Sequence, residues 1–191
     1  MRYVRPGQKN KRAYKLICLF IAFILSCLLC FCSILPGQKL KGEKNKVFFS
    51  PKGGIGNELC EKIDQASQLI SLAVFSFTSR KIAQRLVAAH QRGVNVRIVI
   101  DKNQATDSFS NYLYLKDKGI PVKLKSGLVS PKREHSMHNK FMLIDNKILF
   151  TGSYNFTVSA EYYNYENILE LFDLNIIRSF KDEFERLWDE N

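Results

Sequence analysis

The chain has 191 residues, enough for one globular domain with a buried core, and it carries a formal net charge of +11. The charge is concentrated near the N-terminus: residues 1–46 hold ten Lys or Arg against one acidic residue, whereas residues 47–191 hold nineteen against seventeen. The high pI therefore does not by itself assign the domain to the nucleic-acid-binding proteins. Four of the five cysteines lie within one apolar segment, so the sequence excludes a disulfide scaffold and contains no zinc-ligand spacing.

That apolar segment is residues 16–35, twenty residues without a charge, and the basic flank 1–15 precedes it. A stretch of this length can cross a bilayer as one helix and exceeds the usual apolar core of a cleaved signal peptide. A lipoprotein signal cut before Cys27 is the alternative, but the apolar run continues past that cysteine. We therefore expect an uncleaved, single-pass transmembrane anchor.

The basic residues around this segment bear on its orientation. Six of them precede it, and four follow it up to residue 46. The positive-inside rule then favours an N-terminus in the cytoplasm and a domain on the extracytoplasmic side. Residues 36–46 begin with Pro-Gly and are expected to form a polar linker to a domain that spans residues 47–191.

Patterns typical of strands and helices alternate along this domain. Strands are expected near residues 47–49, 72–75, 94–100, 120–124, 138–144, 148–151 and 165–172. Helices are expected near residues 55–70, 80–92, 107–118 and 175–188, and a long polar loop is expected at residues 125–137. The alternation predicts an α/β layered fold.

The residues with the clearest chemical meaning begin at His138 and follow the pattern H-x-K-x4-D-x6-G-S-x-N. His138 and Lys140 are two apart on an expected strand, so their side chains share a face about 7 Å apart. A histidine can attack or exchange a proton near neutral pH, and a lysine supplies a positive charge with three donors. The pair suits a phosphate, with one group doing the chemistry and the other holding the oxygens.

Asp145 has the opposite strand parity to this pair, and it opens the expected tight turn Asp145-Asn146-Lys147. It either belongs to the site, as its place in the pattern implies, or serves only as a turn residue. Beyond the next strand, Ser153 is expected to cap a short helix whose first turn contains Asn155. The free N–H groups of a helix start, together with the Asn155 amide, would form a phosphate-binding cradle.

The complete pattern resembles the HKD motif of the phospholipase D superfamily, and residues 47–191 resemble its small single-motif members. Those include bacterial endonucleases and mitochondrial cardiolipin hydrolase-like proteins. The resemblance implies a mixed β-sheet flanked by helices, a metal-independent phosphodiesterase and no cofactor. The absence of a Cys/His zinc cluster departs from the animal cardiolipin hydrolase-like branch.

The resemblance also implies a mechanism in which one histidine attacks the diester and a second protonates the leaving alcohol. This chain supplies one such motif, so we expect a homodimer with a composite site. Lys140 and Asn155 would hold the phosphate oxygens, Ser153 would bond within the site, and Glu166 would orient His138 through Nδ1. His135 is the other candidate for a second histidine, but its loop position favours the substrate rim.

The motif does not choose between substrates. A membrane-anchored endonuclease acting on DNA or RNA is the first hypothesis, because eight basic and three acidic residues surround the motif within residues 110–150. A phospholipase D-type lipid hydrolase, working near the membrane that holds residues 16–35, uses the same residues. A third hypothesis is a catalytically inactive module that only binds nucleic acid or lipid.

Overall fold

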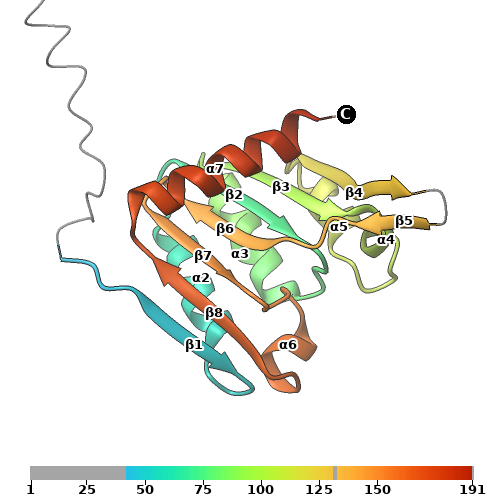
Figure 1. Cartoon of the computed structure of the whole chain (residues 1–191). Helices are drawn as coiled ribbons and strands as arrows, with labels where there is room; N and C mark the ends of the chain where they lie inside the picture. Colours follow the sequence, from blue (N-terminus) through green and yellow to red (C-terminus); the bar gives the residue numbers. More distant parts are fainter. Residues whose placement is uncertain (1–41, 131–132, 191) are drawn as a thin grey trace, which may run out of the picture. The chain divides into compact units, whose positions relative to one another are not determined.

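The computed structural model describes residues 42–130 and 133–190, which form one eight-stranded sheet with helices on both faces (Figure 1). The predicted α/β fold with a mixed sheet flanked by helices is therefore confirmed. The strands are β1 (Lys46–Ser50), β2 (Leu69–Val74), β3 (Asn95–Asp101), β4 (Val122–Ser130), β5 (Arg133–Ser136), β6 (Lys140–Ile144), β7 (Ile148–Gly152) and β8 (Glu166–Leu171). The helices are α2 (Ile55–Gln65), α3 (Arg80–Gln91), α4 (Lys102–Ala105), α5 (Tyr112–Asp117), α6 (Val158–Tyr162) and α7 (Leu174–Asp189).

The strand order is β1-β8-β7-β6-β2-β3-β4-β5. β2, β3 and β4 run parallel to one another, and the other neighbours are antiparallel. The parallel pairs are joined by crossovers that contain helices, as parallel strands require. The antiparallel half is built from the β6–β7 hairpin and from β8, which returns beside β7.

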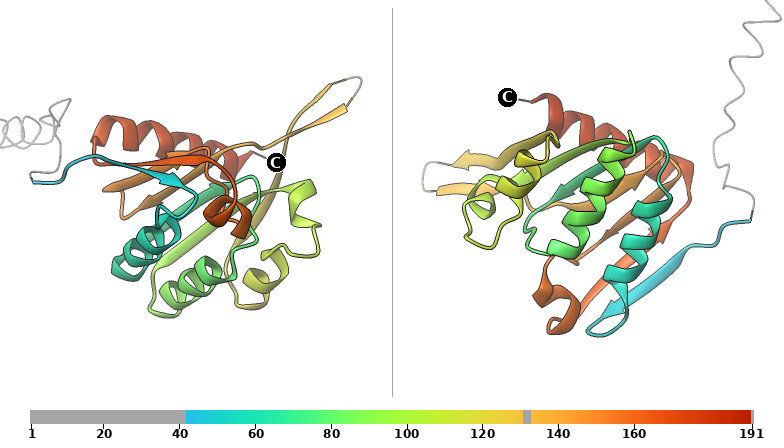
Figure 2. Two further views of the ribbon diagram at one scale, coloured as in Figure 1. Left: turned by 90° about the horizontal axis from the view of Figure 1, so that it is seen from below. Right: turned by 180° about the vertical axis from the view of Figure 1, so that it is seen from behind.

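Helices α2 and α3 cover one face of the sheet, and α7 covers the other (Figure 2). Side chains of β6 point alternately to the two faces of the sheet. Met142 and Ile144 join the core under α2 and α3, whereas Phe141 and Leu143 pack with α7. Phe184 of α7 is fully buried against Phe141. Apolar residues on both faces explain why the first half of the motif reads as a continuous apolar run.

The structure corrects the bounds of two helices expected from the sequence. Leu69 and Ile70, assigned to the helix 55–70, begin β2 instead, because α2 ends at Gln65. The helix expected at 107–118 is shorter: only α5, residues 112–117, falls in that range, and it follows a turn in which Asp107 accepts a hydrogen bond from the Phe109 N–H. Such local side-chain bonds compete with continuous helix.

The polar loop expected at residues 125–137 is mostly a β-hairpin formed by β4 and β5. The hairpin extends away from the body of the sheet (Figure 2). A two-stranded ribbon outside the core has no buried face, so its sequence lacks the apolar alternation that marks a strand.

No helix within residues 42–130 and 133–190 is long and apolar enough to cross a membrane. The transmembrane anchor expected at residues 16–35 lies outside the described residues, as do the basic flank and most of the linker.

Candidate active site

Four strand ends meet at one edge of the sheet. β2 and β7 end there and β6 and β8 begin there, because these neighbours are antiparallel. The register places Lys140 opposite Val74. Segments that are distant in the sequence, residues 138–140, 152–155 and Glu166, are therefore brought to the same edge.

His138 and Lys140 lie close together, although β6 begins at Lys140 and His138 precedes the strand on which it was expected. The Lys140 Nζ lies 3.2 Å from His138 Nδ1 and donates to the His138 carbonyl oxygen at 2.8 Å. Burial lowers the pKa of Lys140, while the Glu166 carboxylate acts in the opposite direction. His138 is an exposed residue.

Phe75, which sequence reasoning missed, forms a wall for this pair. Its ring lies 4.5 Å from the His138 ring, centroid to centroid, and the Lys140 Nζ lies 5.2 Å from the Phe75 centroid. A cation near an aromatic face is stabilised without a counter-ion. Phe75 directly follows a buried apolar strand, so its sequence neighbours gave no sign that it leaves the core.

Glu166 lies in the site but does not contact His138 within the described part of the chain. Its carboxylate accepts hydrogen bonds from the Ser153 hydroxyl at 2.6 Å and from the Asn164 amide at 3.2 Å. The predicted bond from Glu166 to Nδ1 is replaced by the Lys140 ammonium. The one effect of Glu166 on this pair that the structure gives is that its charge favours the protonated form of Lys140.

Ser153 is not a helix cap, contrary to the sequence-based expectation. The helix cap is Thr157, whose hydroxyl accepts from the Ala160 N–H, and α6 has only five residues. Ser153 instead accepts from the Asn167 N–H at 3.1 Å while donating to Glu166. It ties the end of β7 to the start of β8.

Asn155 is placed by its own side chain. Its Oδ1 accepts from the Ser76 N–H at 3.2 Å, and the neighbouring Phe156 N–H donates to the Ser76 carbonyl. The Nδ2 group has no hydrogen-bond partner among the described residues and can donate to a ligand. The predicted donor role thus has a structural basis, although the Ser153 helix start does not.

Gly152 is required by close packing between β7 and β8. A Cβ at this position would lie 2.2 Å from the Asn167 carbonyl oxygen and 2.9 Å from Ile168 Cα. No side chain fits this space, because the obstruction is backbone. The glycine of the motif keeps Ser153 beside Glu166.

Asp145 lies at the far end of β6, five residues from Lys140 and about 17 Å away by the rise of a strand. Its carboxylate accepts from the backbone N–H groups of Ser67, Gln68 and Leu69 and from the Ser67 hydroxyl, at 2.8–2.9 Å. Burial raises the pKa of Asp145, but these bonds together hold it below its usual value. The alternative that Asp145 is structural is the one the geometry favours.

Asp101 is a second residue that the sequence did not single out. It is fully buried at the end of β3, and one carboxylate oxygen accepts from the Met137 N–H at 2.9 Å. The other oxygen caps α4 through the N–H groups of Asn103 and Gln104. Asp101 therefore holds the backbone that leads into His138, and an acidic residue directly after a buried strand was the available signal.

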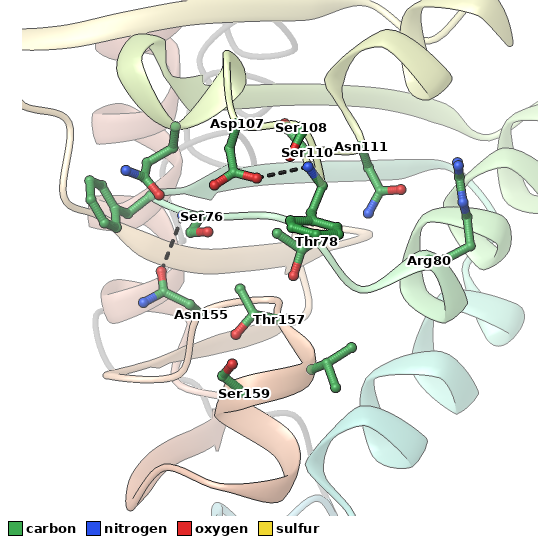
Figure 3. A pocket seen from close by; sticks show the side chains of 14 residues that line it. Ser76, Thr78, Arg80, Asp107, Ser108, Ser110, Asn111, Asn155, Thr157 and Ser159 are labelled. Carbon is green, nitrogen blue, oxygen red and sulfur yellow. Dashed lines mark hydrogen bonds between the residues drawn. The ribbon is translucent and has the colours of Figure 1, made fainter.

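A polar hollow of about 750 Å³ lies beside the site and reaches it through Phe75 and Asn155 (Figure 3). We call it the hydroxyl pocket, because Ser and Thr side chains dominate its wall: Ser76, Thr78, Ser108, Ser110, Thr157 and Ser159.

A second hollow, of about 500 Å³, includes His138 in its wall and is called the basic hollow here. It contains Lys102, Lys125 and Arg186 against one carboxylate, Glu190, with which Arg186 pairs at 2.8 Å. His138 is thus adjacent both to a largely uncharged polar space and to a positively charged one. A substrate in the basic hollow is expected to be anionic.

The other candidates lie elsewhere. His135 is in the β4–β5 hairpin, where its Nε2 is 3.3 Å from the Ser130 hydroxyl. His90 is on α3, and Cys60 is a free, buried core residue, as expected. Within residues 42–130 and 133–190, no cluster of three His, Cys, Asp or Glu side chains could hold a metal ion.

Comparison with known proteins gives consistent matches. The family "Cardiolipin synthase, PLD-like domain" matches residues 59–188. The mitochondrial cardiolipin hydrolase of Xenopus tropicalis is 35% identical over 126 residues, which cover 66% of this chain and 57% of that protein. This chain therefore spans little more than half the length of that curated relative.

Two solved bacterial structures match with better coverage. NucT from Helicobacter pylori has 30% identity and a TM-score of 0.73, covering 76% of this chain and 96% of that one. The phospholipase D family member Nuc from Salmonella typhimurium has 34% identity and a TM-score of 0.69, covering 76% and 94%. The chain belongs to the phospholipase D-like family of phosphodiester hydrolases.

Proposed function

We propose that the protein is a metal-independent endonuclease that hydrolyses DNA or RNA through a phosphohistidine. The observation that carries this proposal is the exposed His138, held beside a lysine ammonium at an edge with two polar hollows. A phosphate at this edge meets a nucleophile and a fixed positive charge. Lys140 and the Nδ2 group of Asn155 would hold its oxygens.

The contact between Lys140 and His138 determines which ring nitrogen of His138 carries the proton before the reaction starts. In the free site the ammonium donates to Nδ1, so a neutral imidazole carries its proton on Nε2. An incoming phosphate attracts Lys140 to its oxygens and frees Nδ1. Solvent water then takes the proton from Nε2 and delivers one to Nδ1, so that the Nε2 lone pair can attack phosphorus. The P–N bond forms as one P–O ester bond breaks, and water later cleaves the P–N bond to give a phosphomonoester.

The leaving alkoxide needs a proton, and the described chain offers no second histidine at this edge. His135 bonds within the β4–β5 hairpin, and His90 lies on α3. We therefore place the acid on His138 of a second copy, in a homodimer with one composite site. The exposure of His138 is consistent with such an arrangement.

The polarity of the site favours nucleic acid over lipid. All residues that line the hydroxyl pocket are polar except Phe75, Phe109 and Val158, so the pocket is poorly suited to acyl chains. The basic hollow suits the repeated phosphates of a nucleic acid strand. A phospholipase D-type lipid hydrolase is the second candidate, because the curated relative reported above is named a cardiolipin hydrolase. Residues 16–35 would anchor either enzyme in a membrane, with the domain on the extracytoplasmic side.

Substrate trials with the full chain in detergent test the proposal. Wild type, His138→Ala and His135→Ala are given single-stranded DNA, RNA, duplex DNA and phospholipid vesicles, each with EDTA. We expect EDTA-resistant cleavage of nucleic acid by wild type and His135→Ala, and none by His138→Ala. Headgroup release from vesicles without nucleic-acid cleavage would instead assign the lipid hydrolase.

Mixed dimers test the composite site. Wild type and His138→Ala are co-expressed in equal amounts, with different tags to measure their ratio. If each site needs two histidines, activity per total protein falls to about one quarter of the wild-type value, because only wild-type pairs work. A value of about one half would show that each chain acts alone.

A further inference from the structure

The hydroxyl pocket is assembled from three separate segments, and none of its wall residues has a role in the chemistry proposed above except Asn155. They are residues 75–80 between β2 and α3, residues 104–111 around the α4–α5 turn, and residues 155–159 at the start of α6 (Figure 3). Backbone bonds connect two of them: the Thr78 and Ser79 N–H groups donate to the Phe156 carbonyl. Its volume of about 750 Å³ lies within the range of small-molecule sites.

A buried amide in the wall lacks a full set of partners. Asn111 is 2% exposed, and its Nδ2 donates to the Phe77 carbonyl at a long 3.4 Å. Its Oδ1 accepts no hydrogen bond from a described residue and is not among the buried atoms that lack a partner, so it is open to the pocket as an acceptor. A ligand N–H or O–H in the pocket would satisfy it.

Arg80 is the only cation in the wall of this pocket. Its guanidinium stacks 3.9 Å from the Tyr114 ring centroid and forms no ion pair within the described part of the chain. A stacked guanidinium keeps its outer N–H groups free for a phosphate. Asp107, the only acid in the wall, already accepts from the Phe109 N–H at 2.7 Å.

Phe109 adds a flat apolar surface at the same pocket. The side chain is 78% exposed, and the Asp107 bond fixes its backbone. A large exposed aromatic side chain next to hydroxyl, amide and guanidinium groups matches the parts of a nucleotide: a base to stack, a sugar to hydrogen-bond and a phosphate to hold.

We infer that the hydroxyl pocket is a nucleotide subsite, which binds the unit adjoining the scissile phosphate. The base stacks on Phe109, the base or sugar donates to Asn111 Oδ1, and Arg80 contacts the phosphate one step along the strand. Phe75 and Asn155 connect the pocket to His138, so the two phosphates belong to consecutive nucleotides. The inference rests on the proposed nuclease activity and adds where the strand lies.

The pocket also implies a single-stranded substrate. A base that stacks on Phe109 must leave its neighbours, which is costly in a duplex and easy in a single strand. The same requirement applies to DNA and RNA, because every base has a face that can stack.

The test compares two exposed apolar side chains in the full-length protein. Phe109→Ala removes the proposed stacking surface, and Leu113→Ala is the matched control, because Leu113 is 71% exposed on α5 and does not line the pocket. With a single-stranded oligonucleotide we expect Phe109→Ala to raise KM about tenfold and Leu113→Ala to leave it unchanged. Melting temperatures verify that both variants are folded.

Abasic oligonucleotides make the assignment specific. Each variant is given a strand with one base removed next to the scissile phosphate, and the cleavage position is mapped. The Phe109→Ala loss should disappear on the abasic strand, because the stacking partner is already absent. An equal Phe109→Ala loss on both strands would overturn the inference.

The remaining outcomes separate the inference from the proposed function. Wild type that cleaves oligonucleotides while Phe109→Ala behaves like Leu113→Ala would overturn the subsite and leave the nuclease intact. Wild type that hydrolyses methyl p-nitrophenyl phosphate but no oligonucleotide would overturn the nuclease and the subsite together.

Discussion

Residues of the same motif lie at both ends of β6, and the two ends differ in how exposed and how fully hydrogen-bonded these residues are. At the start of the strand, His138 is exposed, and Lys140 is half-buried between His138 and Phe75, with the Asn155 amide at the same edge. At the other end, Asp145 is saturated by four hydrogen bonds from residues 67–69. The groups at the first end can still form hydrogen bonds to a ligand, whereas the Asp145 carboxylate is already occupied by its partners within the chain.

This difference shows that a fixed sequence pattern can combine reacting groups with a structural brace. Asp145 has φ +52°, as does Asn146, so the β6–β7 turn needs residues that tolerate the left-handed region. Its carboxylate fixes the segment between α2 and β2, and β2 is the strand that leads to Phe75. Asp145 thus positions one wall of the site from about 17 Å away.

The largest effect is expected from His138→Ala, at the start of β6, which should abolish most of the activity and leave the stability unchanged. Loss of the nucleophile should lower kcat by at least about 10³-fold, a scale typical of a removed covalent catalyst. The exposed residue contributes little burial, so the melting temperature should stay near that of wild type. Single-turnover kinetics and calorimetry measure the two quantities, and a large loss of stability would place His138 among the structural residues.

Lys140→Met is expected to lower kcat about 10²-fold, because the charge that stabilises the transition state is lost. Burial lowers the pKa of Lys140, so its charged form is lost as pH rises through a value below that of an ordinary lysine. Wild-type kcat should therefore fall on the alkaline side, and Lys140→Arg, which stays charged, should lack this limb. A pH–rate profile identical in wild type and Lys140→Arg would contradict the assignment.

At the other end of β6 the expectation reverses. Asp145→Ala leaves three backbone N–H groups and one hydroxyl without their acceptor and places Ala at φ +52°, so the free energy of unfolding should fall by about 2 kcal/mol. Asp145→Asn keeps an acceptor and tolerates the turn, so it should lose about half as much. Urea unfolding measures both, and kcat of the folded protein should remain within a few-fold of wild type. A 10³-fold loss of kcat in folded Asp145→Asn would return Asp145 to the chemistry.

The pH dependence of stability sharpens the same contrast. The folded pKa of Asp145 lies below its unfolded value of about 3.9, so its carboxylate stabilises the fold above that pH. The contribution is lost as pH falls below about 4 and through the folded pKa. The stability gap between wild type and Asp145→Asn should therefore be constant near neutral pH and shrink in acid. Urea midpoints at pH 7, 4 and 3 measure this gap. A gap that widens in acid would mean that folding raises the pKa of Asp145 and would contradict the prediction.

Much of the fold could be predicted from periodicity, because most strands and helices bury one face or both. The strand start at Leu69 could not, since an apolar pair after an amphipathic helix continues the helical pattern equally well. Its boundary depends on Asp145, which is distant in the sequence and holds residues 67–69 extended. The β4–β5 hairpin was missed because it has little buried surface to leave a pattern.

The proximity of His138 and Lys140 could be predicted from their separation of two residues, although only Lys140 lies on β6. Contacts that depend on the direction the chain takes after a strand ends could not be predicted. Ser153 looked like a helix cap, but Gly152 holds it against β8, where its hydroxyl reaches Glu166. Phe75 and Asp101 carry no motif, and only the meeting of strand ends brings them to His138.

Ser153→Ala should have the smallest effect. The change removes the hydroxyl that donates to Glu166 and accepts from the Asn167 N–H, leaving Glu166 held only by Asn164. A less fixed carboxylate favours the charged form of Lys140 less strongly, and we expect a three- to tenfold fall in kcat, equivalent to about 1 kcal/mol.

Ser179→Ala is the control for this change, because the Ser179 hydroxyl also donates one hydrogen bond, to the Asn175 carbonyl, on an exposed position of α7. Ser153→Ala should also shift the alkaline limb assigned to Lys140 to lower pH, since the carboxylate that favours the charged lysine is less well held. A fall in kcat without any shift of that limb would show that Ser153 acts by bracing β7 against β8 and not through the charge of Glu166.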